Sequence, residues 1–170
     1  MATRGRSSIH VGAPPDAVFA VITDLPGLPS WNSRMTGVVE LPPELRPGAE
    51  WVVSFAIAGA RFTSRSHVIE LDGRSHRFVY RSKREDNNPS FTIWGWKVDP
   101  EGDGSKVTLE WEMRPATLFR KKVVGPLRGR QIERSDVPAS LTALRQEVVR
   151  RGQGRPAQAP SSPSSSSGEG

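Results

Sequence analysis

Residues 48–114 alternate between hydrophobic and polar positions with a period of two, and short turn signals divide them into segments. The pairs Asp72-Gly73 and Asp103-Gly104 mark tight turns, because aspartate and glycine both tolerate a positive φ. The positions that share the predicted inner face are Trp51, Val53, Phe55, Ile57, Phe62, Ser64, Ser66, Val68, Phe78, Tyr80, Ser82, Thr92, Trp94, Trp96, Val98, Val107, Leu109, Trp111 and Met113. This pattern is typical of an antiparallel sheet with one side in water. The other side needs a cover from the rest of the chain.

The segments before this meander predict one strand, two short helices and another strand. Residues 7–11 read as the first strand, and Pro14-Pro15-Asp16 opens a helix, since proline is tolerated where the first amides lack partners. The apolar stripe of this helix consists of Val18, Phe19, Val21 and Ile22. We expect a short second helix carrying Leu28 and Trp31, followed by a strand at residues 36–41.

After Met113 the pattern changes to a helical period. The predicted stripe of this long helix carries Leu127, Gln131, Arg134, Val137, Leu141, Leu144 and Val148. Pro138 should bend the helix rather than end it, because the stripe continues beyond the proline. The run Arg150-Arg151-Gly152 ends the helix, with cations near its negative end and glycine as the cap.

The domain organisation follows from these elements. Residues 153–170 contain no large apolar side chain, so we predict a disordered Ser/Pro/Gly-rich tail after one domain of residues 1–152. The element order predicts an α+β fold, in which a curved antiparallel sheet of about six to seven strands wraps around the C-terminal helix. Space left between sheet and helix would form a cavity with apolar walls and a few polar groups.

Three stretches stand out together: residues 9–32 (IHVGAPPDAVFAVITDLPGLPSWN), residues 99–108 (DPEGDGSKVT) and residues 140–145 (SLTALR). Together they resemble the polyketide cyclase/dehydrase family of the START-like, helix-grip superfamily (SRPBCC), over residues 7 to about 150. The resemblance implies a deep hydrophobic cavity, which relatives use to bind lipids, hormones, polyketides or aromatic compounds. It also implies that a minority of relatives catalyse cyclisation or dehydration with polar groups that line the cavity.

Composition excludes several kinds of site. The 170 residues include no cysteine, which excludes a disulfide framework, a cysteine nucleophile and a zinc site made of thiolates. No stretch approaches the roughly 18 apolar residues of a membrane span. The N-terminal residues also lack the apolar run of a signal peptide, so a cytoplasmic location is expected.

The net charge of +6 is concentrated near the C-terminus, since residues 114–151 contain ten Lys/Arg and three Asp/Glu. The simpler interpretation is a solvated helix face. An alternative is weak attraction to an anionic membrane surface through residues Leu118–Val124. Nucleic acid is not expected as a partner, because the positive charges are not interleaved with exposed aromatic residues.

Candidate chemistry is sparse. His10, His67 and His76 share no spacing typical of metal ligands, so neither a metal site nor a cofactor is predicted. Cyclase chemistry on a poly-ketone chain would need groups that stabilise an enolate and move a proton in a dry pocket. The polar candidates expected to face inward are Tyr80, Glu70, Gln131 and Arg134. Each has a plainer interpretation: a core aromatic for the tyrosine and solvent exposure for the charged side chains.

The tryptophans are more informative as a set. They could line a cleft for a flat or lipid-like ligand, or they could fill the interior, since each buried aromatic removes roughly 150–250 Å² from water. The predicted ligand-binding residues are Trp31, Trp51, Phe62, Tyr80, Trp94, Trp96, Trp111, Gln131 and Arg134.

Three functional hypotheses follow. The favoured one is binding of a hydrophobic small molecule, such as a lipid, a polyketide or an aromatic compound, by a monomer or homodimer. The second is a polyketide aromatase/cyclase that uses polar pocket residues, although the sequence assigns no catalytic residue. The third is lipid or membrane-surface binding through the basic C-terminal segment.

Overall fold

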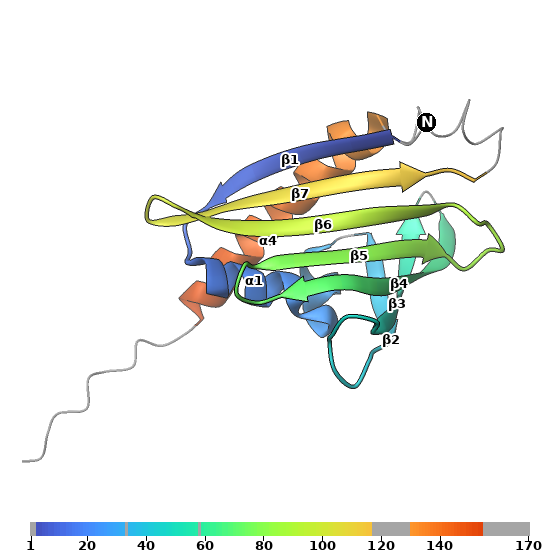
Figure 1. Ribbon diagram of the computed structural model, residues 1–170, viewed down its shortest axis with the longest axis horizontal. Helices are drawn as coiled ribbons and strands as arrows, with labels where there is room; N and C mark the ends of the chain where they lie inside the picture. Colours follow the sequence, from blue (N-terminus) through green and yellow to red (C-terminus); the bar gives the residue numbers. More distant parts are fainter. Residues whose placement is uncertain (1–2, 33, 58, 117–129, 155–170) are drawn as a thin grey trace, which may run out of the picture.

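The computed structural model describes residues 3–32, 34–57, 59–116 and 130–154. Its main feature is a seven-stranded antiparallel sheet in the order β1-β7-β6-β5-β4-β3-β2 (Figure 1). The strands are β1 (Thr3–Val11), β2 (Met35–Glu40), β3 (Glu50–Ile57), β4 (Ala60–Asp72), β5 (Arg77–Arg84), β6 (Phe91–Glu101) and β7 (Gly104–Arg114). The predicted meander is confirmed, and β1 returns to pair with β7 at one edge.

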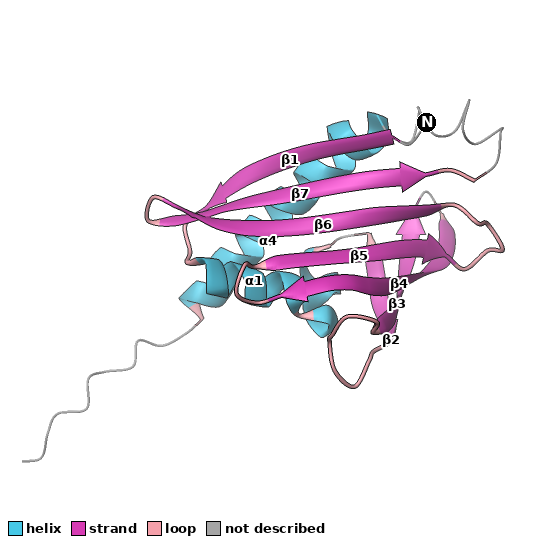
Figure 2. Cartoon of the chain, in the orientation of Figure 1, coloured by secondary structure: helices cyan, strands magenta, loops and turns pink. Residues whose placement is uncertain are grey.

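The helices lie on one side of the sheet (Figure 2). Three short elements follow β1: α1 (Pro15–Thr23), the 3-10 turn η1 (Leu25–Gly27) and α2 (Leu28–Trp31). The closing helix consists of η3 (Ile132–Asp136) and α4 (Val137–Gln153), and α4 contacts β1, β7, α1 and α2. The predicted α+β arrangement of a sheet, two short helices after the first strand and a long C-terminal helix is confirmed.

The inner face of the sheet carries the apolar residues that the period of two predicted. Trp51, Val68, Phe78 and Leu109 are each at most 2% exposed. The pairing of β2 with β3 shifts register twice, and such irregularities increase the local twist of a strand. The buried inner-face residues give the sheet one continuous apolar face toward the helices.

A β-bulge in β4 reverses the faces after Val68. Val68 pairs with Tyr80, whereas Glu70 pairs with Val79, so one extra residue lies between the two pairs. Glu70 consequently lies on the outer face, where its carboxylate is 3.0 Å from Nε of Arg77. The expectation that Glu70 faces inward is wrong.

The predicted stripe of the closing helix is correct from Val137 onward but wrong at Gln131 and Arg134, while Leu127 lies outside the described residues. The element η3 is a π turn, in which the Val137 N–H donates to the carbonyl of Ile132, five residues earlier. Pro138 follows at once and lacks the N–H that a regular helix would use here. The wider turn rotates the preceding residues, so Ile132 is buried whereas Gln131 and Arg134 are exposed. The expectation that Gln131 and Arg134 face the cavity is therefore wrong.

A buried carboxylate, that of Glu147, fastens α4 to the short helices. It is 4% exposed and accepts hydrogen bonds from Arg150 at 2.6 and 2.8 Å, from Arg151 at 2.7 Å and from Ser30 at 3.2 Å. Arg151 also lies 2.8 Å from the carboxylate of Asp24. Because Ser30 belongs to α2 and Asp24 directly precedes η1, this cluster fixes one end of α4 against both elements.

Hydrogen bonds, first of all from Arg150, lower the pKa of Glu147 from 4.5 to about 2. A depressed folded-state pKa means that the stabilisation is present above about pH 4.5 and is lost as the pH falls toward 2. Glu147→Gln should lower the free energy of unfolding at pH 7 by about 1–2 kcal/mol. It should also flatten the acid dependence of that free energy, as measured by urea unfolding at several pH values. Glu133→Gln, at an exposed carboxylate of η3, is the control. An unchanged acid dependence in Glu147→Gln would contradict this account.

Candidate functional site

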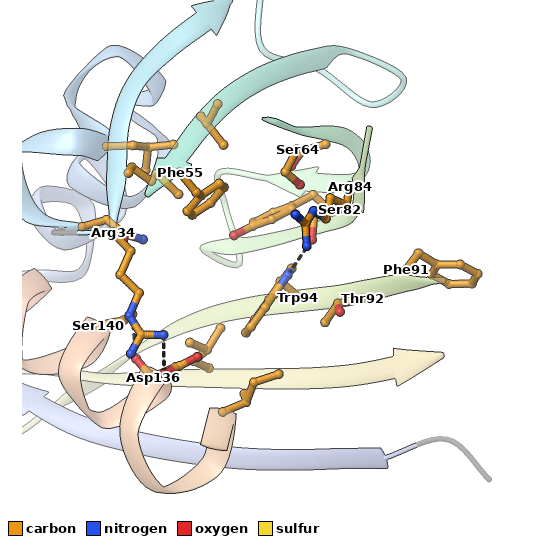
Figure 3. Close-up of a pocket in the computed structure, with 18 of the residues that line it drawn as sticks. Arg34, Phe55, Ser64, Ser82, Arg84, Phe91, Thr92, Trp94, Asp136 and Ser140 are labelled. Carbon is orange, nitrogen blue, oxygen red and sulfur yellow. Dashed lines mark hydrogen bonds and ion pairs between the residues drawn. The ribbon is translucent and has the colours of Figure 1, made fainter. Parts of the chain in front are cut away.

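A cavity of about 550 Å³ lies between the inner face of the sheet and the closing helix. Its walls come from strands β2 to β7, from the short helices, and from η3 and α4 (Figure 3). The closing helix contributes Ile132, Asp136, Ala139, Ser140 and Ala143. The tryptophans therefore leave an open interior rather than filling it.

One end of the cavity is apolar and closed. The residues there are all buried, and they are Ile22, Leu25, Leu28, Trp31, Trp51, Phe78, Trp96 and Leu109. Trp31 and Trp96 meet edge to face with ring centroids 6.2 Å apart, so α2 packs directly on β6 of the sheet. Trp51 contacts Tyr80 in a similar way at 5.0 Å. These contacts hold the aromatic wall rigidly.

The other end lies at the tips of the strands, between the β3–β4 turn, the β5–β6 loop and the end of β7. Two lining residues there, Ala60 and Arg84, are exposed. Phe55 and Phe62 stack with centroids 5.3 Å apart, and Cζ of Arg84 lies 4.0 Å from the Phe62 centroid. Among the described lining residues of the sheet, those at this end lie nearest to solvent.

Six of the predicted site residues line the cavity: Trp31, Trp51, Phe62, Tyr80, Trp94 and Trp96. Trp111 does not, although it is on the inner face and 3% exposed. It pairs with Gly5 of β1, and a Cβ atom on Gly5 would collide with the Trp111 indole. The missing side chain lets the indole lie over β1, away from the cavity. The expectation that Trp111 lines the cavity is therefore wrong.

The cavity wall contains an ion pair that no sequence pattern predicted. Nη1 of Arg34, just before β2, is 2.5 Å from Oδ1 of Asp136 at the end of η3, and both residues line the cavity (Figure 3). Ser140, one turn later, donates from Oγ to the backbone carbonyl of Asp136 at 2.8 Å. A regular helical period would place Arg134 toward the cavity instead of Asp136. The π turn, which the sequence pattern does not show, brings Asp136 to the cavity wall.

Hydroxyl groups line the opposite wall. Trp94 donates from its indole nitrogen to Oγ of Ser82 at 2.9 Å, and Ser64 donates to a backbone carbonyl of β5 at 3.2 Å. Ser66 and Thr92 pair directly with Ser82 from the strands on either side. Three hydroxyl-bearing positions thus form one row across β4, β5 and β6. A ligand with carbonyl or hydroxyl groups could exchange hydrogen bonds with this row.

Tyr80 adds one phenol to the wall, between Trp51 and Trp94. Burial raises the pKa of Tyr80 to about 12, and the indole N–H of Trp96 offsets part of that rise. The phenol is therefore protonated at neutral pH. It can donate a hydrogen bond to a ligand oxygen but does not serve as a base.

The histidines take no part in this cavity. Each lies near a carboxylate: His10 is 3.0 Å from Glu101, His67 is 3.3 Å from Glu50, and His76 is 2.7 Å from Asp16. In the part of the chain that the structure describes, no group of three metal-binding side chains occurs.

The described helices include none long and apolar enough to cross a membrane. The predicted membrane-surface segment, residues Leu118–Val124, lies outside the described residues, as does nearly all of the predicted tail. Both therefore stay predictions.

Tyr80 is the only tyrosine in the chain, so the rise of tyrosinate absorbance with pH reports on this residue alone. The midpoint should lie near 12, against about 10 for a free phenol. Because the folded-state pKa is raised, the stabilisation is complete below about pH 10 and is lost as the pH rises toward 12. Tyr80→Phe should remove this alkaline decline in urea unfolding experiments. A midpoint near 10 in the folded protein would contradict the buried environment of the phenol.

Comparisons with solved structures agree with this architecture. The Zhui aromatase/cyclase from Streptomyces sp. R1128 is 21% identical, with a TM-score of 0.71 over 91% of this chain and 98% of that chain. The di-domain aromatase/cyclase StfQ from the steffimycin biosynthetic pathway is 13% identical, with a TM-score of 0.71 over 90% of this chain and 52% of that chain. Ara h 8.0201 is 15% identical, with a TM-score of 0.68 over 88% of this chain and 99% of that chain. At these identities the likeness concerns the fold alone.

Sequence comparison gives the family. No curated protein matches the chain. The family model described as "Polyketide cyclase / dehydrase and lipid transport" matches residues 2–149, which is most of the sequence. The chain therefore belongs to the polyketide cyclase/dehydrase and lipid transport family, with the helix-grip fold that its sequence predicted.

Proposed function

We propose that this chain binds a hydrophobic small molecule in the cavity between the sheet and the closing helix. The observation that carries the proposal is the cavity of about 550 Å³, whose lining is mostly apolar, with polar side chains at a minority of positions. Apolar ligand surface buried there would contribute about 25 cal/mol per Å². The wall is already packed, so little ordering would oppose binding. Membership of a family whose description includes lipid transport supports the same reading.

The first test is native mass spectrometry of the purified chain, followed by denaturing extraction and identification of any bound compound. A stoichiometric hydrophobic adduct would support the proposal and give the chemical class of the ligand. A clean mass, combined with no thermal shift across lipids, flavonoids and polyketide-like aromatics, would contradict it.

A cavity-filling variant tests the location. Ala143 of α4 faces the cavity, so Ala143→Phe should weaken binding of the neutral dye Nile red by about tenfold or more, which corresponds to about 1.4 kcal/mol. Val149→Phe, which adds a ring at a position that is 46% exposed on the same helix, is the control. Fluorescence titration measures both affinities, and thermal unfolding checks that both variants fold. Equal affinities in the two variants would place the dye outside the cavity.

A second candidate function, that of a polyketide aromatase/cyclase, is favoured by one specific observation. The Tyr80 phenol and the Arg34–Asp136 pair face the same cavity. A protonated phenol and a guanidinium are suited to stabilise an enolate oxygen in a site of low dielectric. Asp136 would accept a proton only after it separated from Arg34.

This candidate predicts that the chain changes the product profile of a polyketide synthase reaction, and that Tyr80→Phe reduces that change by about tenfold to a hundredfold. Arg134→Ala, at an exposed position of η3, should behave like the wild type. Chromatography of the products with and without each variant is the measurement. If the wild-type chain leaves the product profile unaltered, the enzymatic candidate is removed and the binding proposal stands.

A further inference from the structure

The cavity lining carries an unbalanced positive charge. Among the described lining residues, three have formally charged side chains: Arg34, Asp136 and Arg84. Arg34 and Asp136 lie 2.5 Å apart and neutralise each other. The charge of Arg84 has no such partner within the lining, so the described wall has a net charge of about +1 near neutral pH.

Arg84 places this charge at the end of the cavity that lies at the tips of the strands. Arg84 ends β5 and pairs with Ser64, and it shares the inner face with Tyr80 and Ser82. Its guanidinium carbon lies 4.0 Å from the Phe62 centroid, so the guanidinium stacks on the aromatic wall while the side chain as a whole remains 46% exposed. Figure 3 shows the guanidinium at the same end of the cavity as Ser82.

One carboxylate outside the lining, that of Asp86, competes for this cation. Its Oδ2 lies 3.2 Å from Nε of Arg84, while its Oδ1 accepts the N–H of Asn88 at 3.2 Å. Both charged side chains are about one-third or more exposed, so the pair is weak. A guanidinium has five N–H donors, and within the described residues Nε is the one side-chain nitrogen of Arg84 with an ion-pair partner. Asp86 thus contacts the guanidinium through Nε, and the two terminal nitrogens remain available to a ligand.

Among the described residues, the opposite end of the cavity is lined mainly by buried apolar and aromatic side chains, such as Trp31, Trp51 and Trp96. We infer that the ligand is an amphipathic monoanion, a fatty or aromatic carboxylic acid, that inserts its apolar part toward Trp31 and places its carboxylate on Arg84. This inference rests on the proposed binding function and makes Arg84 a residue that determines specificity. A planar guanidinium binds a carboxylate through two parallel hydrogen bonds, which a neutral alcohol cannot match. Ser64 and Ser82 lie close enough in the register to complete the polar contacts.

The experiment compares decanoate with decan-1-ol, two probes that share a chain length and differ in charge. Isothermal titration with the full chain should show tighter binding of decanoate. Arg84→Gln should weaken the binding of decanoate by about five- to tenfold. The affinity for decan-1-ol should stay unchanged, because the apolar contacts remain. Added salt should weaken decanoate binding in the wild type but should have no such effect in Arg84→Gln.

Two neighbouring positions provide matched controls. Lys83→Gln removes the same charge one residue earlier in β5, at an exposed position opposite Arg65 outside the cavity lining, and should leave both affinities unchanged. Asp86→Asn removes the competing carboxylate and should strengthen decanoate binding.

The outcomes separate the two proposals. If both probes bind the wild type with equal affinity, or if Lys83→Gln weakens decanoate as much as Arg84→Gln does, the role of Arg84 is overturned while binding in the cavity stands. If neither probe binds and Ala143→Phe has no effect on Nile red, the proposed function itself fails.

Discussion

A seven-stranded sheet has an inner face wider than one helix can cover, and the rest of this structure depends on that constraint. At about 4.8 Å per strand the sheet is roughly 30 Å across, whereas a helix with its side chains is roughly 10–12 Å in diameter. The apolar inner face cannot remain in water, so the sheet curves around α4 and the short helices close one end. The volume that no side chain fills is the cavity of about 550 Å³. The cavity is thus a consequence of covering the sheet with too few helices.

The shape of this remaining volume is set by where α4 is held. At one end Glu147 accepts hydrogen bonds from Arg150, Arg151 and Ser30, which keeps the helix close to the short helices. At the other end the π turn carries Asp136 to Arg34, so an ion pair joins this end of the helix to the start of β2. The two polar attachments lie at opposite ends of the helix. Between them small side chains, Ala139, Ser140 and Ala143, leave room for a ligand.

The sequence predicted the faces of the strands because a period of two survives wherever the register is regular. Five of the predicted site residues that line the cavity, including Tyr80 and Phe62, were found for that reason, and Trp31 was predicted on the short second helix. Its errors fall at irregularities: the bulge after Val68 displaced Glu70, and the π turn displaced Gln131 and Arg134. Periodicity cannot reveal an inserted residue or a wider helical turn. The Arg34–Asp136 pair and the position of Trp111 over Gly5 depend on contacts distant in sequence, which no local pattern contains.

The polar groups of the cavity bear on whether it binds or catalyses. Tyr80 is held in its protonated form, and Arg84 and the Trp94-bound Ser82 are also able to donate. The one carboxylate in the described lining, Asp136, is already paired with Arg34. A wall rich in donors and poor in free bases is complementary to a ligand that presents acceptor oxygens or a negative charge. Proton abstraction from a polyketide would require the Arg34–Asp136 pair to open, which would also release one end of the closing helix. The resting geometry therefore favours holding an oxygen-bearing hydrophobic molecule over removing a proton from it.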